Sequence, residues 1–109
     1  MLPPLAGQIE RYMTLVSARQ KLTAANIANA DTPDYKTKDI DFQSELNQSM
    51  AGPPRIVEAS GLATKNDGNN VSLDREARML AENAMRFNAA SQLLQGQIRS
   101  IRAAIQDGR

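Results

Sequence analysis

Hydrophobic residues recur three or four positions apart in two long stretches of the chain, and a stretch without a lasting period separates them. In the first stretch, one apolar row consists of Leu5, Ile9, Tyr12 and Val16. A second, offset row consists of Leu15, Ala18, Leu22, Ala25 and Asn29. These spacings predict a helix from about residue 4 to residue 30. Two offset rows make a wide apolar arc, which is typical of a helix with more than one neighbour in a bundle.

The second periodic stretch begins after Ser72, a favourable N-cap that Asp74 and Glu76 follow in the first helical turn. Its apolar positions alternate four and three residues apart: Leu73, Ala77, Leu80, Ala84, Phe87, Ser91, Leu94, Ile98, Ile101 and Ile105. This heptad pattern predicts a helix over about residues 72–106, on the order of 50 Å long. The alternative is an ordinary amphipathic helix on a globular core. Phe87 is expected to fill the widest gap between helices.

The middle segment, residues 31–71, is rich in Pro, Gly, Asn, Asp and Ser, and its irregular pattern predicts mainly loop. Alternation from Asp39 to Phe42 weakly indicates a short extended piece, and residues 42–50 could form one or two helical turns. The expected fold is therefore all-α. Two long terminal helices pair as an antiparallel-type coiled coil or bundle, joined by a largely irregular segment within a single domain, residues 1–109.

The composition of the 109 residues narrows the classes of partner. Aromatic residues make up 4%, so smaller apolar side chains must fill the core, which suits helix-on-helix packing. A net charge of +1 argues against a nucleic-acid partner and against direct lipid binding, since both favour a basic surface. The sequence contains neither a long apolar run nor a pattern of the cleavable signal-peptide type.

Candidate chemistry is sparse, because the chain contains no histidine and no cysteine. The usual nucleophile–base pairs and the thiolate or imidazole metal sites are therefore missing. Asp39 and Asp41 could form a carboxylate pair, but we expect both to be solvated. The sequence thus predicts no catalytic residue, no cofactor site and no metal site, and favours an interaction protein over an enzyme.

The end of the first helix has an unusual polar composition. Asn26 and Asn29 share a helical face, and their carboxamides could fix the register of packing or simply complete the helix end. We favour the packing role, because Asn29 continues an apolar row. Thr32-Pro33 ends the helix, since proline disfavours the helical conformation of the residue before it. Tyr35 is expected to anchor the exit with a packed ring and a bonded hydroxyl, the alternative being a half-exposed loop tyrosine.

Two segments resemble a known family. LTAANIANADTPDYKTKDIDF (Leu22 to Phe42) is similar to the signature of bacterial flagellar rod and hook proteins, in which Ala-Asn-x-x-Asn precedes x-Thr-Pro-Gly-Tyr-Lys. The segment from Asp67 to Ile105 resembles the C-terminal helix of the proximal rod members of that family, above all in Asn-Asn-Val-x-Leu-Asp-Arg-Glu. The resemblance covers about two-thirds of the chain.

The resemblance implies a structural subunit of the proximal rod in the flagellar basal body, exported through the flagellar type III apparatus without a cleavable signal. Such subunits form a hollow helical drive shaft in the periplasm, with paired terminal helices at its core. The implied partners are other rod proteins, the adaptor between rod and membrane ring, and the export gate. The alternative is a helical coiled-coil adaptor or export chaperone with one partner.

The residues expected at subunit interfaces are Leu15, Leu22, Asn26, Asn29, Thr32, Pro33, Tyr35, Leu73, Leu80, Phe87, Leu94, Ile98, Ile101 and Ile105. One position departs from the family signature, because Asp34 stands where the family usually has glycine. Aspartate fits the third position of a type I turn better than that of a type II turn, which requires a positive φ. The sequence therefore favours a type I turn but leaves the turn type open.

Overall fold

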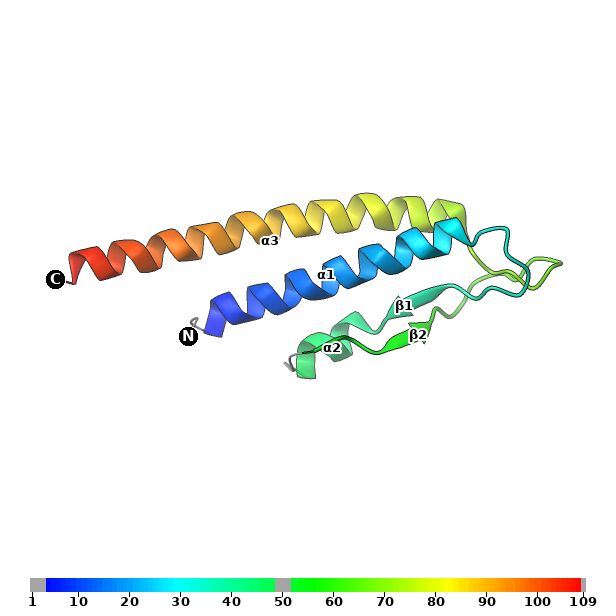
Figure 1. Ribbon diagram of the computed structural model, residues 1–109, viewed down its shortest axis with the longest axis horizontal. Coiled ribbons are helices and arrows are strands. Elements are labelled where there is room, and N and C mark those ends of the chain that lie inside the picture. Colours follow the sequence, from blue (N-terminus) through cyan, green and yellow to red (C-terminus); the bar gives the residue numbers. More distant parts are fainter. Residues whose placement is uncertain (1–3, 49–51, 109) are drawn as a thin grey trace.

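The computed structural model describes residues 4–48 and 52–108 and has the shape of a rod, with extents of 68 × 24 × 18 Å (Figure 1). Its elements, in order, are α1 (Pro4–Ala28), β1 (Lys38–Ile40), α2 (Phe42–Gln48), β2 (Ile56–Glu58) and α3 (Leu73–Asp107). The predicted turns over residues 42–50 correspond to α2, and residues 49 and 50 lie outside the described part. No helix in the described ranges is long and apolar enough to cross a membrane.

The two long helices lie side by side and run in opposite directions, so the chain begins and ends at the same end of the rod (Figure 1). The predicted all-α class with paired terminal helices is confirmed. At 35 residues, α3 is longer than α1, and its last turns continue past the start of α1. We call residues 98–107 of α3 the overhang.

The predicted boundaries of the helices have local causes. Pro33 follows α1 closely, and the chain turns directly after Ala28. At the start of α3, the Ser72 hydroxyl accepts a hydrogen bond from the Arg75 amide at 3.2 Å, and the Ser72 carbonyl accepts one from the Glu76 amide at 3.0 Å. The first bond satisfies a donor that a helix start would otherwise leave free, and the second is the first regular backbone bond of the helix.

The middle of the chain is more ordered than the loop that the sequence predicted, because it contains a small antiparallel sheet and a short helix. Strand β1 pairs with β2, with Lys38 opposite Glu58 and Ile40 opposite Ile56. The Asp41 side chain accepts from the Ser44 amide at 3.3 Å and caps α2. We call β1, α2 and β2 together the arm. It packs on α1, which lies between the arm and α3 (Figure 1). Helix α1 therefore has two neighbours within the chain.

The apolar core is small and is built largely from short side chains. Its buried apolar residues are Ala6, Ile9, Leu15, Val16, Ala30, Ile40, Val71 and Ala90. Polar side chains are buried beside them, at Thr23, Asn26, Thr37, Asn69, Glu76 and Asn83 among others. Buried polar groups are costly unless they are bonded, so the bonds of these residues decide how the rod is held together.

The buried face of α3 is offset from the predicted heptad stripe. Its buried residues are Glu76, Asn83 and Ala90, which themselves repeat every seven positions. The stripe positions Leu80 and Leu94 are half-buried, whereas Leu73 and Ile105 are exposed. Apolar periodicity indicates which side chains avoid water but not which neighbour covers them. The pairing with α1 therefore uses only part of the stripe.

Candidate functional site

Asn26 is the centre of the structure where α1 ends and α3 begins. Its side chain donates to the Lys38 carbonyl at 2.9 Å and to Glu76 Oε1 at 2.7 Å. Its oxygen accepts from the Lys38 amide at 3.0 Å and from the Tyr35 hydroxyl at 3.1 Å. Four bonds saturate a carboxamide that is only 1% exposed. Asn26 thus joins α1 to the exit loop, to β1 and to α3.

Asn29 behaves differently from Asn26, although the sequence favoured a packing role for both. Its side chain donates to the Ala25 carbonyl of its own helix at 2.8 Å and accepts from the Thr32 hydroxyl at 3.0 Å. These are bonds of the helix end, the alternative that the sequence left open. Within the chain, Asn29 therefore completes α1, and Asn26 makes the long-range contacts.

The type I turn favoured at Asp34 is wrong. Asp34 has a φ of 62°, the conformation that the family's glycine would adopt, and the Tyr35 amide donates to the Thr32 carbonyl at 3.3 Å. Proline at the second position and a positive φ at the third define a type II turn. Aspartate is among the residues that tolerate this region. The Asp34 amide also donates to the Asp67 carbonyl at 2.9 Å, which joins this turn to the loop before α3.

The loop before α3 closes the open end of α1. The Asn69 side chain donates to the carbonyls of Asn29 and Thr32 at 2.9 and 2.8 Å, and the Lys65 ammonium donates to the Ala30 carbonyl at 3.1 Å. Asn70 Oδ1 accepts from the Thr37 amide at 2.6 Å. These bonds tie the loop before α3 to the turn that follows α1. The Asn-Asn pair was noticed in the sequence as part of the resemblance, but its spatial role was not predicted.

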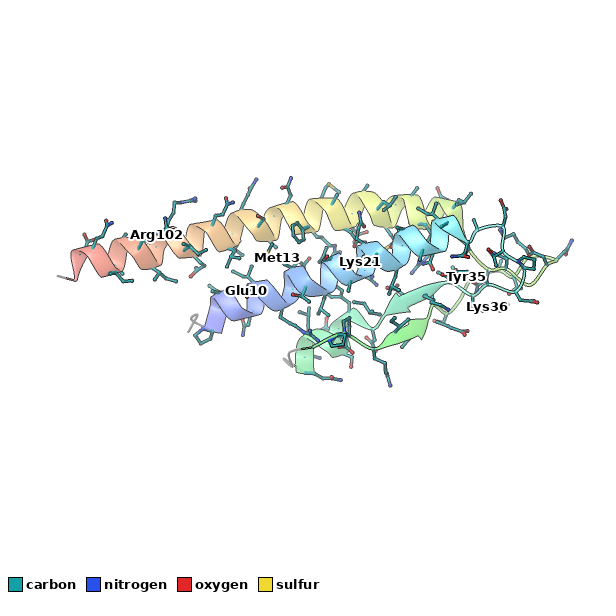
Figure 2. The ribbon with its side chains drawn as sticks, viewed as in Figure 1. Glu10, Met13, Lys21, Tyr35, Lys36 and Arg102 are labelled. Atoms are coloured by element: carbon teal, nitrogen blue, oxygen red, sulfur yellow. The ribbon has the colours of Figure 1, made fainter. Side chains whose placement is uncertain are left out.

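Residues 26–37 and 65–76 together form one polar unit, which we call the joint. Figure 2 shows Tyr35 and Lys36 in the loops at this end of the rod. The Tyr35 hydroxyl is bonded to Asn26, as expected of an anchor, and the Lys38 ammonium lies 5.1 Å from the ring centroid. Burial, and then the charge of Glu76, raise the pKa of Tyr35 above its ordinary value. The Lys36 ammonium donates to the Gly68 carbonyl across the two loops.

Asp39, expected to be solvated, is instead buried between two arginines. Its Oδ1 accepts from Arg19 Nε at 2.8 Å and from the Ile40 amide at 2.7 Å, and its Oδ2 accepts from Arg75 Nη2 at 2.8 Å. Burial by itself would raise the pKa of Asp39, but the bonds from Arg19, the Ile40 amide and Arg75 outweigh it and hold the pKa below its ordinary value. Sequence alternation could not reveal these partners, which come from α1 and α3.

Glu76 completes this buried ionic cluster. Its carboxylate is inaccessible to solvent and accepts from Arg75 Nη1 at 2.5 Å and from Asn26. Burial opposes the charge of Arg75, but the bond and the charge of Glu76, followed by those of Asp39, raise the pKa of Arg75 above its ordinary value. The four side chains Arg19, Asp39, Arg75 and Glu76 carry two positive and two negative charges. The sequence had assigned Glu76 only to the first turn of a helix.

The arm is held on α1 by a second set of contacts nearer the chain start. Arg11 donates to Glu45 Oε1 at 3.2 Å and to the Gly52 carbonyl at 2.7 Å. The rings of Tyr12 and Phe42 meet edge to face with centroids 5.4 Å apart, and the Arg19 guanidinium lies 5.3 Å from the Phe42 centroid. Polar and ring contacts, rather than a large apolar core, fix the arm.

Away from the joint, α3 exposes large apolar side chains. Ile105 is 68% exposed, Leu73 57% and Phe87 41%. Phe87 and Leu94 border a groove of about 490 Å³ whose opposite side is formed by Met13, Ser17 and their neighbours on α1. Figure 2 shows Glu10, Met13 and Lys21 along α1, and Arg102 on the overhang past the start of α1.

The residues predicted at interfaces fall into three groups. Leu15 and Asn26 are buried inside the chain. The half-buried ones are Leu22, Asn29, Tyr35, Leu80, Leu94, Ile98 and Ile101. The exposed ones are Thr32, Pro33, Leu73, Phe87 and Ile105.

Over residues 4–48 and 52–108, no group of carboxylates is arranged to hold a metal ion.

Comparison with known proteins connects this geometry to a family. A family model described as flagella basal body rod protein matches residues 13–36, which include the end of α1 and the turn at Asp34. The flagellar basal body rod protein FlgB of Escherichia coli strain K12 is 32% identical over 125 residues, with 91% of each chain covered. The chain belongs to the FlgB family of flagellar basal body rod proteins.

Other FlgB proteins match over similar lengths. FlgB of Yersinia ruckeri is 29% identical over 137 residues and covers 99% of this chain and 100% of its own. FlgB of Bacillus subtilis strain 168 is 29% identical over 119 residues, covering 93% and 92%. The expected structural rod protein of the flagellar basal body is confirmed, and nothing in these similarities favours the adaptor or chaperone alternative.

Proposed function

We propose that this FlgB-family chain packs side by side with other rod subunits in the proximal rod, a hollow helical shaft. In this proposal its neighbours are other rod proteins, the adaptor between the rod and the membrane ring, and the export gate. The chain acts there as a structural part and catalyses no reaction. Family membership supports association with other rod components.

The observation that carries this proposal is the exposed apolar surface of α3. One helix face is covered by α1, yet Leu73, Phe87 and Ile105 of the heptad stripe remain exposed. Met85 and Leu93, outside that stripe, are also exposed, at 67% and 55%. Large apolar side chains gathered along one element favour contact with another protein. An extended helix pair with such a surface suits packing among similar helices.

Ile105 offers the sharpest test, because it lies on the overhang and is the most exposed of the large apolar residues described. Ile105→Asp places a charge where we expect a neighbouring subunit to exclude water. We expect motility and the yield of complete basal bodies to fall at least about tenfold, the effect of roughly 1.4 kcal/mol of lost association energy per contact. Swimming in soft agar and electron microscopy of purified basal bodies would measure this.

Gln106→Asp is the matched control, since it adds the same charge at the next position, which is polar in the parent chain. This variant should swim normally. Normal basal bodies in Ile105→Asp cells would contradict the proposed packing surface. In an otherwise unchanged chain, a photo-crosslinking amino acid at position 105 or 73 would identify the neighbours. Cross-linked products with rod proteins, the adaptor or the export gate would distinguish the proposed partners.

A further inference from the structure

The arm packs on α1, yet one of its side chains, the Asp39 carboxylate, is hydrogen-bonded to both long helices. Asp39 of β1 accepts two bonds from Arg19 of α1, at 2.8 and 3.1 Å, and one from Arg75 of α3 at 2.8 Å. Asp39 is 8% exposed, so little water competes for these bonds. The bond to Arg75 therefore ties the arm to a helix that lies on the opposite side of α1 (Figure 1).

A second connection runs parallel to the first. Asn26 binds both the amide and the carbonyl of Lys38 in β1, and it also donates to Glu76 of α3. Arg75 joins the two connections, because its guanidinium donates to Asp39 through Nη2 and to Glu76 through Nη1. Two neighbouring residues in the first turn of α3 thus add to the bonds by which α1 holds β1.

The apolar positions of α3 cannot by themselves fix this alignment. Leu80, Phe87 and Leu94 recur every seven residues, so sliding α3 by one heptad would again place large apolar side chains beside α1. The polar positions do distinguish the two alignments. After such a slide, Glu82 would take the place of Arg75, and its carboxylate would face Asp39. Like charges at close range, away from water, repel strongly.

We propose that Asp39 couples the arm to the helix pair, so that the arm docks fully on α1 only when α3 lies in the observed register. Arg75 is the positioning residue in this coupling. The arm then reaches its final position after α1 and α3 have paired. Its position in an assembled subunit therefore indicates whether the two helices have paired in the observed register. This coupling is a property of the chain itself and does not depend on which neighbours the subunit has.

Cysteine cross-linking can measure arm docking, because the chain contains no cysteine of its own. Gln8 on α1 and Asn47 on α2 are exposed and line one groove between these two helices, far along the arm from Asp39. Gln8→Cys with Asn47→Cys, bridged by a short bis-maleimide, reports arm docking. Met13→Cys with Leu94→Cys, two positions on the groove between α1 and α3, reports helix pairing. Both pairs can be scored by gel mobility of the full chain, in cells or purified.

The test variant is Arg75→Met combined with Glu76→Gln, which removes the bond to Asp39 without leaving an unpaired buried charge. We expect the rate of cross-linking between positions 8 and 47 to fall about five-fold, a typical coupling between side chains in one network. The rate between positions 13 and 94 should stay near that of the parent. Arg75→Lys alone, which keeps the charge, should restore part of the arm signal.

The matched control is Arg78→Met with Asp74→Asn, which removes an exposed ion pair from the same helical turns. Its arm signal should equal that of the parent. Unchanged cross-linking between positions 8 and 47 in the test variant would overturn the coupling. An equal fall in both signals would also overturn it, because the cluster would then hold the helix pair rather than transmit its register to the arm. Neither result depends on rod assembly, so the proposed function stands or fails separately.

Discussion

The two ends of this rod are built on opposite principles. At the joint, buried amides and charges are saturated by one another, as at Asn26 with four hydrogen bonds and Asn69 with two helix-end carbonyls. At the overhang, α3 continues past the start of α1 (Figure 1), and the spacing of Ile98, Ile101 and Ile105 puts them on one helical face. Ile105 is 68% exposed there. At the joint, the polar groups find their hydrogen-bond partners within the chain. At the overhang, apolar surface remains that the chain itself does not cover.

This difference separates two tasks that a structural subunit must perform. Directional hydrogen bonds specify one arrangement, because an alternative arrangement leaves buried groups without partners. Apolar surface supplies association energy but little direction. The joint therefore determines the relative positions of α1, α3 and the arm. The apolar surface of the overhang contributes favourable free energy only when another subunit buries it on assembly. Substitutions at the two ends should differ accordingly, in stability at the joint and in assembly at the overhang.

The largest effect on stability is expected for Asn26→Ala. The substitution leaves the backbone groups of Lys38 and one oxygen of Glu76 without a partner, although Glu76 keeps its ion pair with Arg75. The loss of several buried hydrogen bonds should lower the free energy of unfolding by about 3–5 kcal/mol. Urea denaturation followed by circular dichroism would measure it. Asn29→Ala, which removes local bonds only, should cost about 1 kcal/mol. Equal losses for the two variants would contradict the central role of Asn26.

Gly68→Ala tests the contact between the two loops of the joint. A Cβ at this position would overlap the Asp34 carboxylate and lie 3.3 Å from Asp34 Cα, a backbone atom that cannot turn away, and the φ of +86° already disfavours any side chain. We expect a loss of about 2 kcal/mol in the free energy of unfolding. Gly61→Ala is the matched control, since its φ is +76° but a Cβ there meets nothing within 4 Å. If both variants lost the same stability, the contact with Asp34 would contribute nothing.

Acid should weaken the buried ionic cluster beside the joint through Asp39. Its folded-state pKa is held below the ordinary value, chiefly because bonds from Arg19, the Ile40 amide and Arg75 outweigh the effect of burial. Its contribution to stability is therefore complete above the unfolded pKa, near 4, and is lost as the pH falls through the folded value. Unfolding free energies between about pH 6 and pH 3 should fall more steeply for the parent than for Asp39→Asn.

Asp41→Asn provides the comparison for that experiment, because Asp41 is exposed and caps α2 without meeting either arginine of the cluster. This variant should keep most of the acid sensitivity of the parent. A parent-like slope in Asp39→Asn would show that other carboxylates carry the effect.

The smallest effect on stability is expected at the overhang. Ile105→Asp should change the free energy of unfolding of the isolated chain by no more than about 0.5 kcal/mol, because an exposed side chain loses little on substitution. The same variant is expected to impair rod assembly severely. Chemical denaturation beside the swimming assay would test this contrast. A large loss of stability would mean that the overhang is covered within the chain in solution.

Much of the secondary structure followed from local signals in the sequence. These signals are the helical spacing, the proline after Thr32 and the N-cap at Ser72, and each affects only residues a few positions away. Helices α1 and α3 begin and end close to them. The resemblance of the joint segment to the flagellar family was likewise carried by consecutive residues. Periodicity also indicated more than one neighbour for α1, but it did not indicate that the arm is one of them.

Local signals could not predict the polar contacts, because these contacts join residues that are far apart in the chain. Asp39 was expected in solvent because its arginine partners lie 20 and 36 positions away. The apolar stripe of α3 did not indicate which face of the helix meets α1, because Glu76 and Asn83 are buried there with partners on α1. Asp34 adopts the positive φ of a glycine because bonds from the neighbouring loop hold the turn.

The sequence by itself determined that the chain forms two long helices, where they stop, and to which family they belong. These properties depend on backbone propensity, apolar spacing and short motifs, which are local. Only the tertiary structure decided which face of α3 meets α1, that the arm packs on α1, and that Asn26, Asp39, Arg75 and Glu76 share one buried cluster. The reason is physical: a polar side chain is buried only where a partner from another element satisfies it, and that partner is known only once the chain has folded.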